Sequence, residues 1–363
     1  MLYIFNPSCE MAVRSDTINY TPPSIIQKME EDLACIVMLL TSSKDDYVLS
    51  DRPDEQLLNI WFSDTDCPQF ITRKEFKAKA RAGEMIMPWG ANRSIYNLMG
   101  RKDEWKLRNL MSRKTSVTVE RTLSRHTDFW GFDAAPEIVT STQQLEKLLN
   151  SDYNCDVVLK SLWSASGRGV RFFSPSDFWP ALDYAGRTIK ADGAIVLEKK
   201  LKRIAECSIL LYADGENIHP WRMDIEECIN VYKSADGGSL GQEIAGAGRL
   251  QLFNELLPAN WLQTTITNLC QAFSTVMTGS GYVGPIGTDA MLYTSNNGDI
   301  KLRPCMEANI RYCMGNIGVM VNRHLCTGSS AIWGMQSFSK DGGMGAFLPK
   351  EARRDASNIV IRQ

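Results

Sequence analysis

Short apolar stretches alternate with polar turns along most of the chain, a spacing typical of mixed α/β proteins. In the first part, residues 2–5 and 85–87 have the length and composition of buried strands. Residues 24–34 have helical spacing behind a pair of prolines. The apolar run 35–40 fits either a strand or a helix, because so short a run has no clear period. The sequence therefore predicts a small α/β unit at the start of the chain.

The rest of the chain continues this mixture of helices and strands. Helices are predicted over residues 102–123, which are strongly basic, over 142–150 behind a Ser141 cap, over 178–184, and over 258–276, the longest. Strands are predicted at residues 157–160, 194–197, 205–212 and 216–221. The pattern favours an α/β or α+β fold.

Two long strands within residues 281–309 are predicted to form a hairpin around a turn rich in Asn and Gly. Asp289 lies on the first strand, while Glu307, Asn309 and Arg311 alternate along the second and so project from one face. Carboxylate and amide oxygens are ligands that Mg²⁺ takes, and it completes its shell with water and phosphate oxygens. The pattern predicts a magnesium site that serves a nucleotide. The alternative is a solvated face at a sheet edge.

A second candidate feature lies upstream, where an apolar strand ends in Lys160 and leads into a Ser- and Gly-rich loop, residues 161–170. Small residues let backbone N–H groups approach phosphate oxygens, and a lysine ammonium adds positive charge. The segment therefore suits a phosphate. The alternative is an ordinary hairpin turn with a surface lysine.

Composition narrows the class of protein. The chain has 363 residues, 44% hydrophobic and 23% charged, which is typical of a folded protein with two or three domain-sized units. A net charge of -2 and a pI near 6.0 give no basic field for nucleic acid or an anionic membrane. There is no C-x-x-C pair, no apolar run long enough to cross a bilayer, and no basic segment of a signal peptide at the start. We therefore expect a cytoplasmic protein with reduced thiols and no contact with nucleic acid or membrane.

Several common catalytic motifs do not occur in the sequence. It contains no G-x-x-x-x-G-K-[ST] phosphate loop, no G-x-S-x-G elbow and no H-E-x-x-H helix. Its G-x-G-x-x-G, residues 279–284, follows a predicted helix and precedes a strand, the reverse of the dinucleotide-binding order. The three histidines are isolated in sequence, so a Ser-His or Cys-His pair is not indicated.

Five features in a fixed order resemble the ATP-grasp family. They are Lys160 with its loop, Glu198 at a strand end, Glu206 on the next strand, Asp289, and the E-x-N-x-R run that begins at Glu307. The resemblance implies an α/β (α+β) ATP-grasp fold, in which two α+β subdomains clasp ATP behind a small α/β pre-ATP-grasp domain. It also implies ATP and Mg²⁺ as cofactors.

The resemblance covers about residues 110–325 and implies a division of the chain into four segments. These are a pre-ATP-grasp domain at residues 1–108, a small subdomain with the glycine-rich loop at 109–190, a subdomain with the Mg²⁺ site at 191–340, and a tail at 341–363.

The resemblance further implies roles for single residues in binding ATP. Lys160 would contact the phosphates, and Ser166, Gly167 and Gly169 lie in the loop that would close over them. Glu198 resembles the acid that meets the adenine amino group.

More implied contacts follow along the chain. The backbone of Lys199 and Leu201 would read the adenine edge, and Glu206 resembles the acid that holds the ribose hydroxyls. The implied metal ligands are Asp289, Glu307 and Asn309.

The sequence departs from the family pattern at two places. The family's earlier lysine matches either Lys114 or Arg113. Gly287 stands where several members carry an arginine, two residues before the metal aspartate. The charge of that arginine would have to come from Arg222, Arg249, Arg303 or Arg311.

The reaction implied by the resemblance joins two small molecules, a carboxylate and an amine. The carboxylate attacks the γ-phosphate of ATP, and the amine then displaces phosphate from the acylphosphate. Such a reaction needs cations and metal more than a protein nucleophile. The implied catalytic residues are Arg311, Arg222 and Lys160. Alternatives are an ATP-dependent kinase acting on a hydroxyl and a nucleotide-binding protein without catalysis, and a homodimer is possible.

The acceptor pocket is expected between the N-terminal unit and the segments around Arg222 and residues 237–248. The loop groups Asn6, Pro7 and Glu10, with residues 20–23, could line such a cleft, the alternative being ordinary turns.

Overall fold

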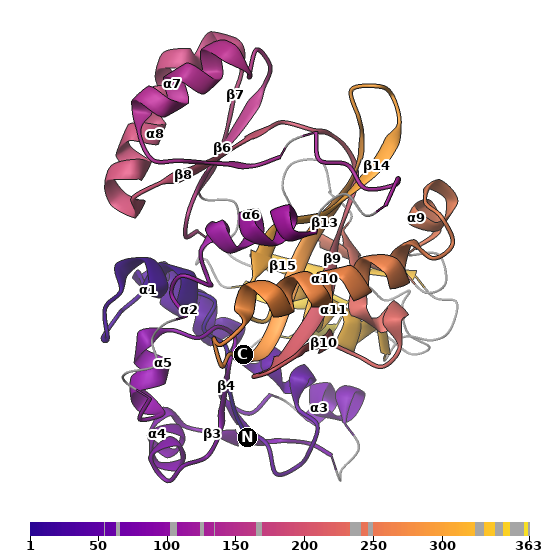
Figure 1. Ribbon diagram of the computed structural model, residues 1–363. Coiled ribbons are helices and arrows are strands. Elements are labelled where there is room, and N and C mark those ends of the chain that lie inside the picture. Colours follow the sequence, from indigo (N-terminus) through magenta and orange to yellow (C-terminus); the bar gives the residue numbers. More distant parts are fainter. Residues whose placement is uncertain are drawn as a thin grey trace.

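The computed structural model of the chain describes residues 1–53, 55–62, 66–101, 107–123, 127–133, 135–164, 169–232, 241–245, 250–323, 330–337, 344–348 and 359–361. Within these ranges the strands form three sheets. Figure 1 shows them as three parts of the molecule: an N-terminal unit, a small antiparallel subdomain that carries α7 and α8, and a large antiparallel sheet behind α10.

The N-terminal unit is built on a parallel sheet with the order β3-β2-β1-β4 among the described strands. Its strands are β1 (Leu2–Ile4), β2 (Tyr47–Leu49), β3 (Gln69–Ile71) and β4 (Ile86–Pro88). Its helices are α1 (Cys9–Ser15), α2 (Ser24–Asp32), α3 (Glu55–Trp61), α4 (Arg73–Arg81), α5 (Arg93–Leu98) and the 3-10 helix η1 (Ala34–Leu40).

Local chemistry explains how these helices begin. Thr72 and Glu75 form a reciprocal capping box at the start of α4, and the Asn92 side chain accepts a hydrogen bond from the backbone N–H of Ile95 at the start of α5. The run that fitted either a strand or a helix is the 3-10 helix η1, and Cys35 to Leu40 are all buried. Burial on all sides removes the amphipathic pattern that distinguishes a helix from a strand.

The small subdomain is an antiparallel sheet with the order β5-β8-β6-β7, against which two helices pack. Its elements are β5 (Glu137–Val139), α7 (Thr142–Ser151), β6 (Val157–Ser161), β7 (Val170–Phe173), α8 (Phe178–Asp192) and β8 (Ile195–Lys199). The predicted Ser141 cap of α7 is present. The prediction for residues 178–184 was too short, because the buried face of α8 continues through Ala185 and Thr188, which give little apolar signal. Gly193, at φ 81°, ends this helix.

The large sheet has the order β14-β13-β9-β11-β12-β15-β16-β17 in the described residues, with β10 paired to β9. Its strands are β9 (Lys202–Asp214), β10 (Ile218–Pro220), β11 (Ile229–Tyr232), β12 (Gly241–Ala245), β13 (Val283–Thr294), β14 (Ile300–Asn309), β15 (Ser330–Ser337), β16 (Met344–Leu348) and β17 (Ile359–Ile361). Both strands of the predicted closing hairpin, β13 and β14, are confirmed.

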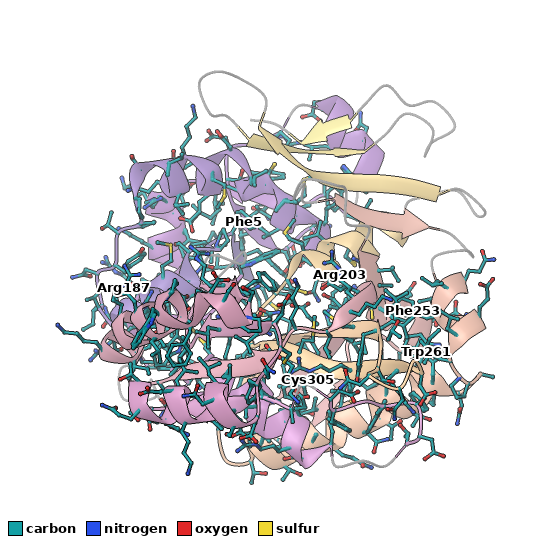
Figure 2. All side chains as sticks on the ribbon, turned by 90° about the horizontal axis from the view of Figure 1, so that it is seen from above. Phe5, Arg187, Arg203, Phe253, Trp261 and Cys305 are labelled. Atoms are coloured by element: carbon teal, nitrogen blue, oxygen red, sulfur yellow. The ribbon has the colours of Figure 1, made fainter. Side chains whose placement is uncertain are left out.

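Four helices accompany this sheet: α6 (Arg113–Thr122), α9 (Gln251–Leu256), α10 (Trp261–Met277) and α11 (Met314–Arg323). The long basic helix predicted from residue 102 is shorter, because Ser112 caps α6 and residues 107–112 form turns. The predicted longest helix is α10, which buries Trp261 against Phe253 with stacked rings 5.3 Å apart (Figure 2). Helix α11 packs on η1 and on strands β9, β11 and β12, so it connects the large sheet to the N-terminal unit.

The sheet to which each strand belongs differs from the predicted division of the chain at two places. Strand β8 follows the boundary between residues 190 and 191, yet it pairs with β5 and β6 of the small subdomain. Strands β16 and β17 belong to the large sheet although they lie in the predicted tail. We propose that the small subdomain ends after Lys199 and that the large subdomain continues through β17.

Two further expectations concern thiols and membranes. Cysteines in the described ranges are free thiols, and most of them are buried. None of the helices in those ranges combines the length and the apolar composition needed to span a bilayer.

Candidate functional site

The closing hairpin places two carboxylates opposite each other. Asp289 on β13 pairs in register with Glu307 on β14. Asn309 Nδ2 donates to Asp289 Oδ2 over 3.1 Å, and Ser208 on the adjacent strand donates to Asp289 Oδ1 over 2.8 Å. The structure therefore brings the three predicted metal ligands together and adds Ser208, which sequence reasoning missed.

The electrostatics of this pair favour a bound cation. Burial and the neighbouring charge of Glu307 raise the pKa of Asp289 to about 6. Two acids and one amide make up the oxygen set; no cluster of three or more His, Cys, Asp or Glu is found among the described residues. This donor set fits Mg²⁺, which usually takes only one or two protein carboxylates.

Arg311 lies just beyond β14, in the turn that leads to α11. Its Nε donates to Glu10 Oε1 over 2.6 Å, and its Nη2 donates to Asn309 Oδ1 over 2.9 Å. The backbone N–H of Tyr312 donates to the carbonyl of Trp89, which holds this turn against the N-terminal unit. Arg311 thus connects one predicted metal ligand to the first helix of the chain.

Arg113, at the first position of α6, faces the same site. Its Nη2 donates to Glu307 Oε1 over 2.7 Å, and its Nη1 donates to Ser164 Oγ over 2.7 Å and to the Ser161 carbonyl over 2.6 Å. The neighbouring Lys114 is exposed. Of the two cations that the sequence left open, Arg113 is therefore the one beside Glu307 and the loop.

A pattern in the sequence could have shown that Arg113, and not Lys114, faces the site. Arg113, Ser116 and Glu120 follow a spacing of three and four on α6, and all three are buried. Ser116 Oγ accepts a hydrogen bond from the backbone N–H of Ala308 on β14 over 2.8 Å. The polar residues of this helix therefore face the hairpin.

The glycine-rich loop is described at its two ends. Ser166 and Gly167 lie outside the described residues. At Gly169 an added Cβ would lie 1.9 Å from Ser161 Oγ, so any other residue would displace the serine side chains around it. The Gly169 carbonyl accepts hydrogen bonds from the Ser161 N–H over 2.9 Å and from the Tyr184 hydroxyl over 3.0 Å. These bonds fix the end of the loop to β6 and α8.

Four buried charged residues form a cluster between the small sheet and the hairpin. Glu198 forms ion pairs with both Lys160 and Arg303. Arg303 also binds Glu120 through Nη2 and Oε2 at 2.8 Å and through Nε and Oε1 at 3.0 Å. Two acids thus face two bases, and each of the four is at most 9% exposed.

The pKa values in this cluster reflect its arrangement. Burial opposes ionisation of Glu198, yet the charges of Arg303 and Lys160 hold its pKa below the ordinary value. Burial raises the pKa of Glu120 despite its contact with Arg303. Lys160 and Glu198, for which the resemblance implies contacts with ATP, are bound to each other in this structure.

The remaining implied nucleotide contacts lie at the connection between the two sheets. Lys199 ends β8, and its ammonium lies 5.6 Å from the Tyr153 ring centroid. Leu201 follows and is half-buried. Glu206 on β9 lies opposite Met291 of β13 and pairs with Arg203 at 3.0 Å.

The missing arginine at Gly287 has a steric explanation. An added Cβ on Gly287 would lie 2.7 Å from Cys313 Sγ, so a larger side chain there requires Cys313 to shift. Of the four arginines considered as substitutes, Arg311 lies beside Asn309, one of the predicted metal ligands, and Arg303 belongs to the buried cluster. The Arg222 guanidinium lies over the Trp221 ring at 4.5 Å and reaches Met320, while Arg249 lies outside the described residues.

Two cavities adjoin these residues. The first lies between the three parts of the molecule and is lined by Glu10, Met111, Arg113, Leu162, Ser164 and residues 307–311. The second follows the carboxyl ends of the parallel strands of the N-terminal unit, where α/β sheets commonly bind ligands. Asn6 and residues 20–22 line the second cavity, and Glu10 lines the first. Arg222, expected at the same cleft, lines neither of them, and residues 237–240 and 246–248 lie outside the described residues.

Comparison with known proteins supports the fold. No protein-family model and no curated protein sequence matches the chain. A phosphoribosylamine–glycine ligase from Thermotoga maritima superposes with a TM-score of 0.51 at 13% identity, over 95% of this chain and 83% of that chain. A biotin carboxylase–beta-gamma-ATP complex from Campylobacter jejuni superposes with a TM-score of 0.50 at 15% identity, over 97% of this chain and 80% of that chain.

Both of these solved structures have the ATP-grasp fold. The chain therefore has the fold of the ATP-grasp superfamily, and the fold class implied by the resemblance is confirmed.

Proposed function

We propose that this chain is a Mg-ATP-dependent ligase that joins a carboxylate to an amine through an acylphosphate. The observation that carries the proposal is the pairing of Asp289 with Glu307, with Asn309 beside them and Arg113 and Arg311 on either side. A proposed metal site with an arginine on each side suits phosphoryl transfer, because that reaction depends mainly on positioning and charge neutralisation. The two solved structures of the same fold, a phosphoribosylamine–glycine ligase and a biotin carboxylase–beta-gamma-ATP complex, support this class of reaction.

Mg²⁺ would be held by Asp289, Glu307 and Asn309, and bound there it offsets the negative charge of the phosphates. Arg113, rather than Lys114, would contact a phosphate beside the glycine-rich loop, because its guanidinium already bridges Ser164 and Glu307. Ser166, Gly167 and Gly169 are proposed to cover the phosphates through backbone N–H groups.

The nucleotide base and sugar would bind along the connection between the two sheets. Lys199 and Leu201 would present backbone groups to adenine, and Glu206 would hold the ribose. Lys160 and Glu198 are proposed to contact ATP as well, and this requires ATP to replace part of their mutual ion pair.

The carboxylate substrate would bind beside Arg113 and Arg311; the cavity that they line has a volume of only about 10 Å³, so binding requires it to widen. There the two guanidinium groups orient its oxygens toward the γ-phosphate and stabilise the charge that develops. Arg222 is proposed to act at the side of the N-terminal unit, where its neighbour Trp221 packs against the core that contains α11.

A hydroxamate screen tests the proposal. The protein would be incubated with Mg-ATP, hydroxylamine as a general amine, and a panel of carboxylic acids, and both ADP and hydroxamate would be measured. The proposal expects an acid that yields the two products in equal amounts, with ¹⁸O passing from the acid into phosphate. Asp289→Asn is expected to abolish both products.

Other outcomes of the same screen contradict the ligase. A phosphorylated alcohol with no free phosphate would indicate the hydroxyl kinase instead. ATP binding with no ADP from any acid or alcohol would indicate a binding protein.

A further inference from the structure

Glu10, in the first turn of α1, uses only one of its two carboxylate oxygens within the described structure. Oε1 accepts from Arg311 Nε over 2.6 Å and lies 2.5 Å from Arg311 Nη2. Oε2 is buried and has no hydrogen-bond partner among the described residues. The residue as a whole is 8% exposed. A buried carboxylate oxygen without a partner is costly, so a ligand that supplies a donor would stabilise it.

Glu10 is the residue of the N-terminal unit that is found among those lining the first cavity described above. It lines the same cavity as Arg113, Glu307 and Asn309. Arg311 Nη2 contacts both Glu10 Oε1 and Asn309 Oδ1, so one side chain separates Glu10 from the proposed metal ligands. Glu10 therefore lies in the cavity that the proposed metal ligands also line, with Arg311 between them.

The backbone around Glu10 is held in place by the neighbouring loop. Asn6 exchanges two hydrogen bonds with Gly90, at 2.8 and 3.3 Å. A Cβ on Gly90 would lie 2.3 Å from Cys9 Sγ and 3.3 Å from Arg311 Cβ, so glycine permits the close approach of both segments. Glu10 and Arg311 are therefore pre-organised relative to each other.

If Glu10 served only as the counter-ion of Arg311, its oxygen Oε2, which is unpaired in the described part of the chain, would have no explanation. An Arg–carboxylate pair gains most when two parallel N–H···O bonds engage both oxygens. Here both donors of Arg311 meet Oε1, and the second oxygen is left for another donor.

We propose that Glu10 binds the ammonium group of the acceptor substrate and receives a proton from it; this rests on the ligase proposed above. The ammonium transfers one proton to Glu10 Oε2, and the freed lone pair attacks the carbonyl carbon of the acylphosphate. The new C–N bond forms, and the C–O bond to phosphorus breaks with its electron pair leaving on phosphate. A second proton passes from nitrogen to phosphate, so the products are the amide, hydrogen phosphate and protonated Glu10, which returns its proton to solvent.

The substrate class follows from this assignment. A buried carboxylate favours an acceptor that is a primary ammonium ion over a neutral amine, an amide or an alcohol. The property to measure is therefore the preference of the enzyme for a cationic over a neutral amine acceptor.

The test compares two amines in wild type and Glu10→Gln, with the acid found in the hydroxamate screen. Ammonium is almost fully cationic near neutral pH, while hydroxylamine is mostly neutral. Gln keeps an oxygen for Arg311 but replaces the free oxygen with an N–H donor. We expect kcat/KM for ammonium to fall by about 10-fold or more, the loss of a hydrogen bond to a charged group, with hydroxylamine changed by less than about 3-fold. The KM for the acid is expected to stay the same.

Two variants control for folding and for general loss of charge. Glu84→Gln removes an exposed acid of the same unit and should change neither amine. If Glu10→Gln does not fold, Glu10→Asp keeps the charge with a shorter reach, and the same ratio between the two amines is measured.

The outcomes separate the two proposals. If wild type forms product but Glu10 variants lose ammonium and hydroxylamine equally, or lose neither, the role of Glu10 is overturned and the ligase remains. If wild type forms no ADP with any acid, the ligase is overturned and the role of Glu10 with it.

Discussion

Arg113 and Glu307 form an ion pair 2.7 Å long, although 194 positions separate them in the sequence. The same guanidinium holds Ser164 at the start of the glycine-rich loop. One side chain on α6 therefore joins the proposed metal site on the closing hairpin to the loop of the small subdomain.

Replacing Arg113 with Gln should reduce ATP turnover much more than replacing Lys114 with Gln. Arg113 is buried among the proposed phosphate and metal groups, whereas Lys114 next to it is exposed. Loss of a charged donor at a transition state commonly costs about 100-fold or more in kcat. ADP formation with the acid from the screen measures the effect, and equal effects of the two substitutions would remove Arg113 from the site.

The steric account of Gly287 predicts coupling between two positions. Gly287→Ala places a methyl group against Cys313 and should lower the free energy of unfolding by about 1–3 kcal/mol. Cys313→Ala makes room for that methyl, so the double variant should be more stable than the sum of the single losses by about 1 kcal/mol. Urea unfolding of the three variants measures this. Strict additivity would mean that Cys313 does not exclude a side chain at position 287.

Local patterns predicted much of the fold and the proximity of the three residues at the centre of the candidate site. The proximity of Asp289, Glu307 and Asn309 could be predicted because they lie on the two strands of one hairpin. They are separated by no more than about 20 positions in the sequence. The strands were recognisable for the same reason, since burial of one or both faces leaves a short-range pattern.

Contacts between distant segments were not predictable in this way. The bond from Arg311 to Glu10 joins positions 301 residues apart, and no local period records it. The pairing of Lys160 with Glu198 likewise depends on how two strands of the small sheet come into register. Sequence patterns identified these residues as candidates. Their contact partners are set by the packing of the three parts of the molecule.

Arg303→Met should destabilise the protein strongly. The substitution leaves Glu120 and Glu198 buried with one cation fewer, a change that typically costs about 3–5 kcal/mol. Urea unfolding gives the free energy. The matched control is Arg187→Met, since Arg187 lies at the outside of the small subdomain (Figure 2) and pairs with Asp183 four residues away at the surface.

Arg187→Met is expected to change stability by less than about 0.5 kcal/mol. Comparable losses in the two variants would show that burial of the Arg303 cluster has no special cost.

Asp214 should make stability depend on pH in the acid range. Backbone N–H groups of Asn217 and Glu216, with His219 at 2.7 Å, lower the pKa of Asp214 from 3.8 to about 2. Because the folded pKa lies below the unfolded value, the stabilisation is present above about pH 4 and is lost as the pH falls toward 2.

Asp214→Asn should therefore be less stable than wild type near pH 6, and the difference should shrink below pH 4. Urea unfolding across this range measures it. A difference that stays constant down to pH 2 would contradict the hydrogen-bonded carboxylate.

The central claim is that Asp289, Glu307 and Asn309 hold the metal of a bound nucleotide. A crystal structure with a non-hydrolysable ATP analogue and Mn²⁺, a common substitute for Mg²⁺, tests it directly through the anomalous signal of the metal. The account predicts a Mn²⁺ peak within about 2.5 Å of oxygens of both Asp289 and Glu307, with the phosphates beside Arg113. A nucleotide and metal bound elsewhere, with Asp289 and Glu307 uncoordinated, would contradict it.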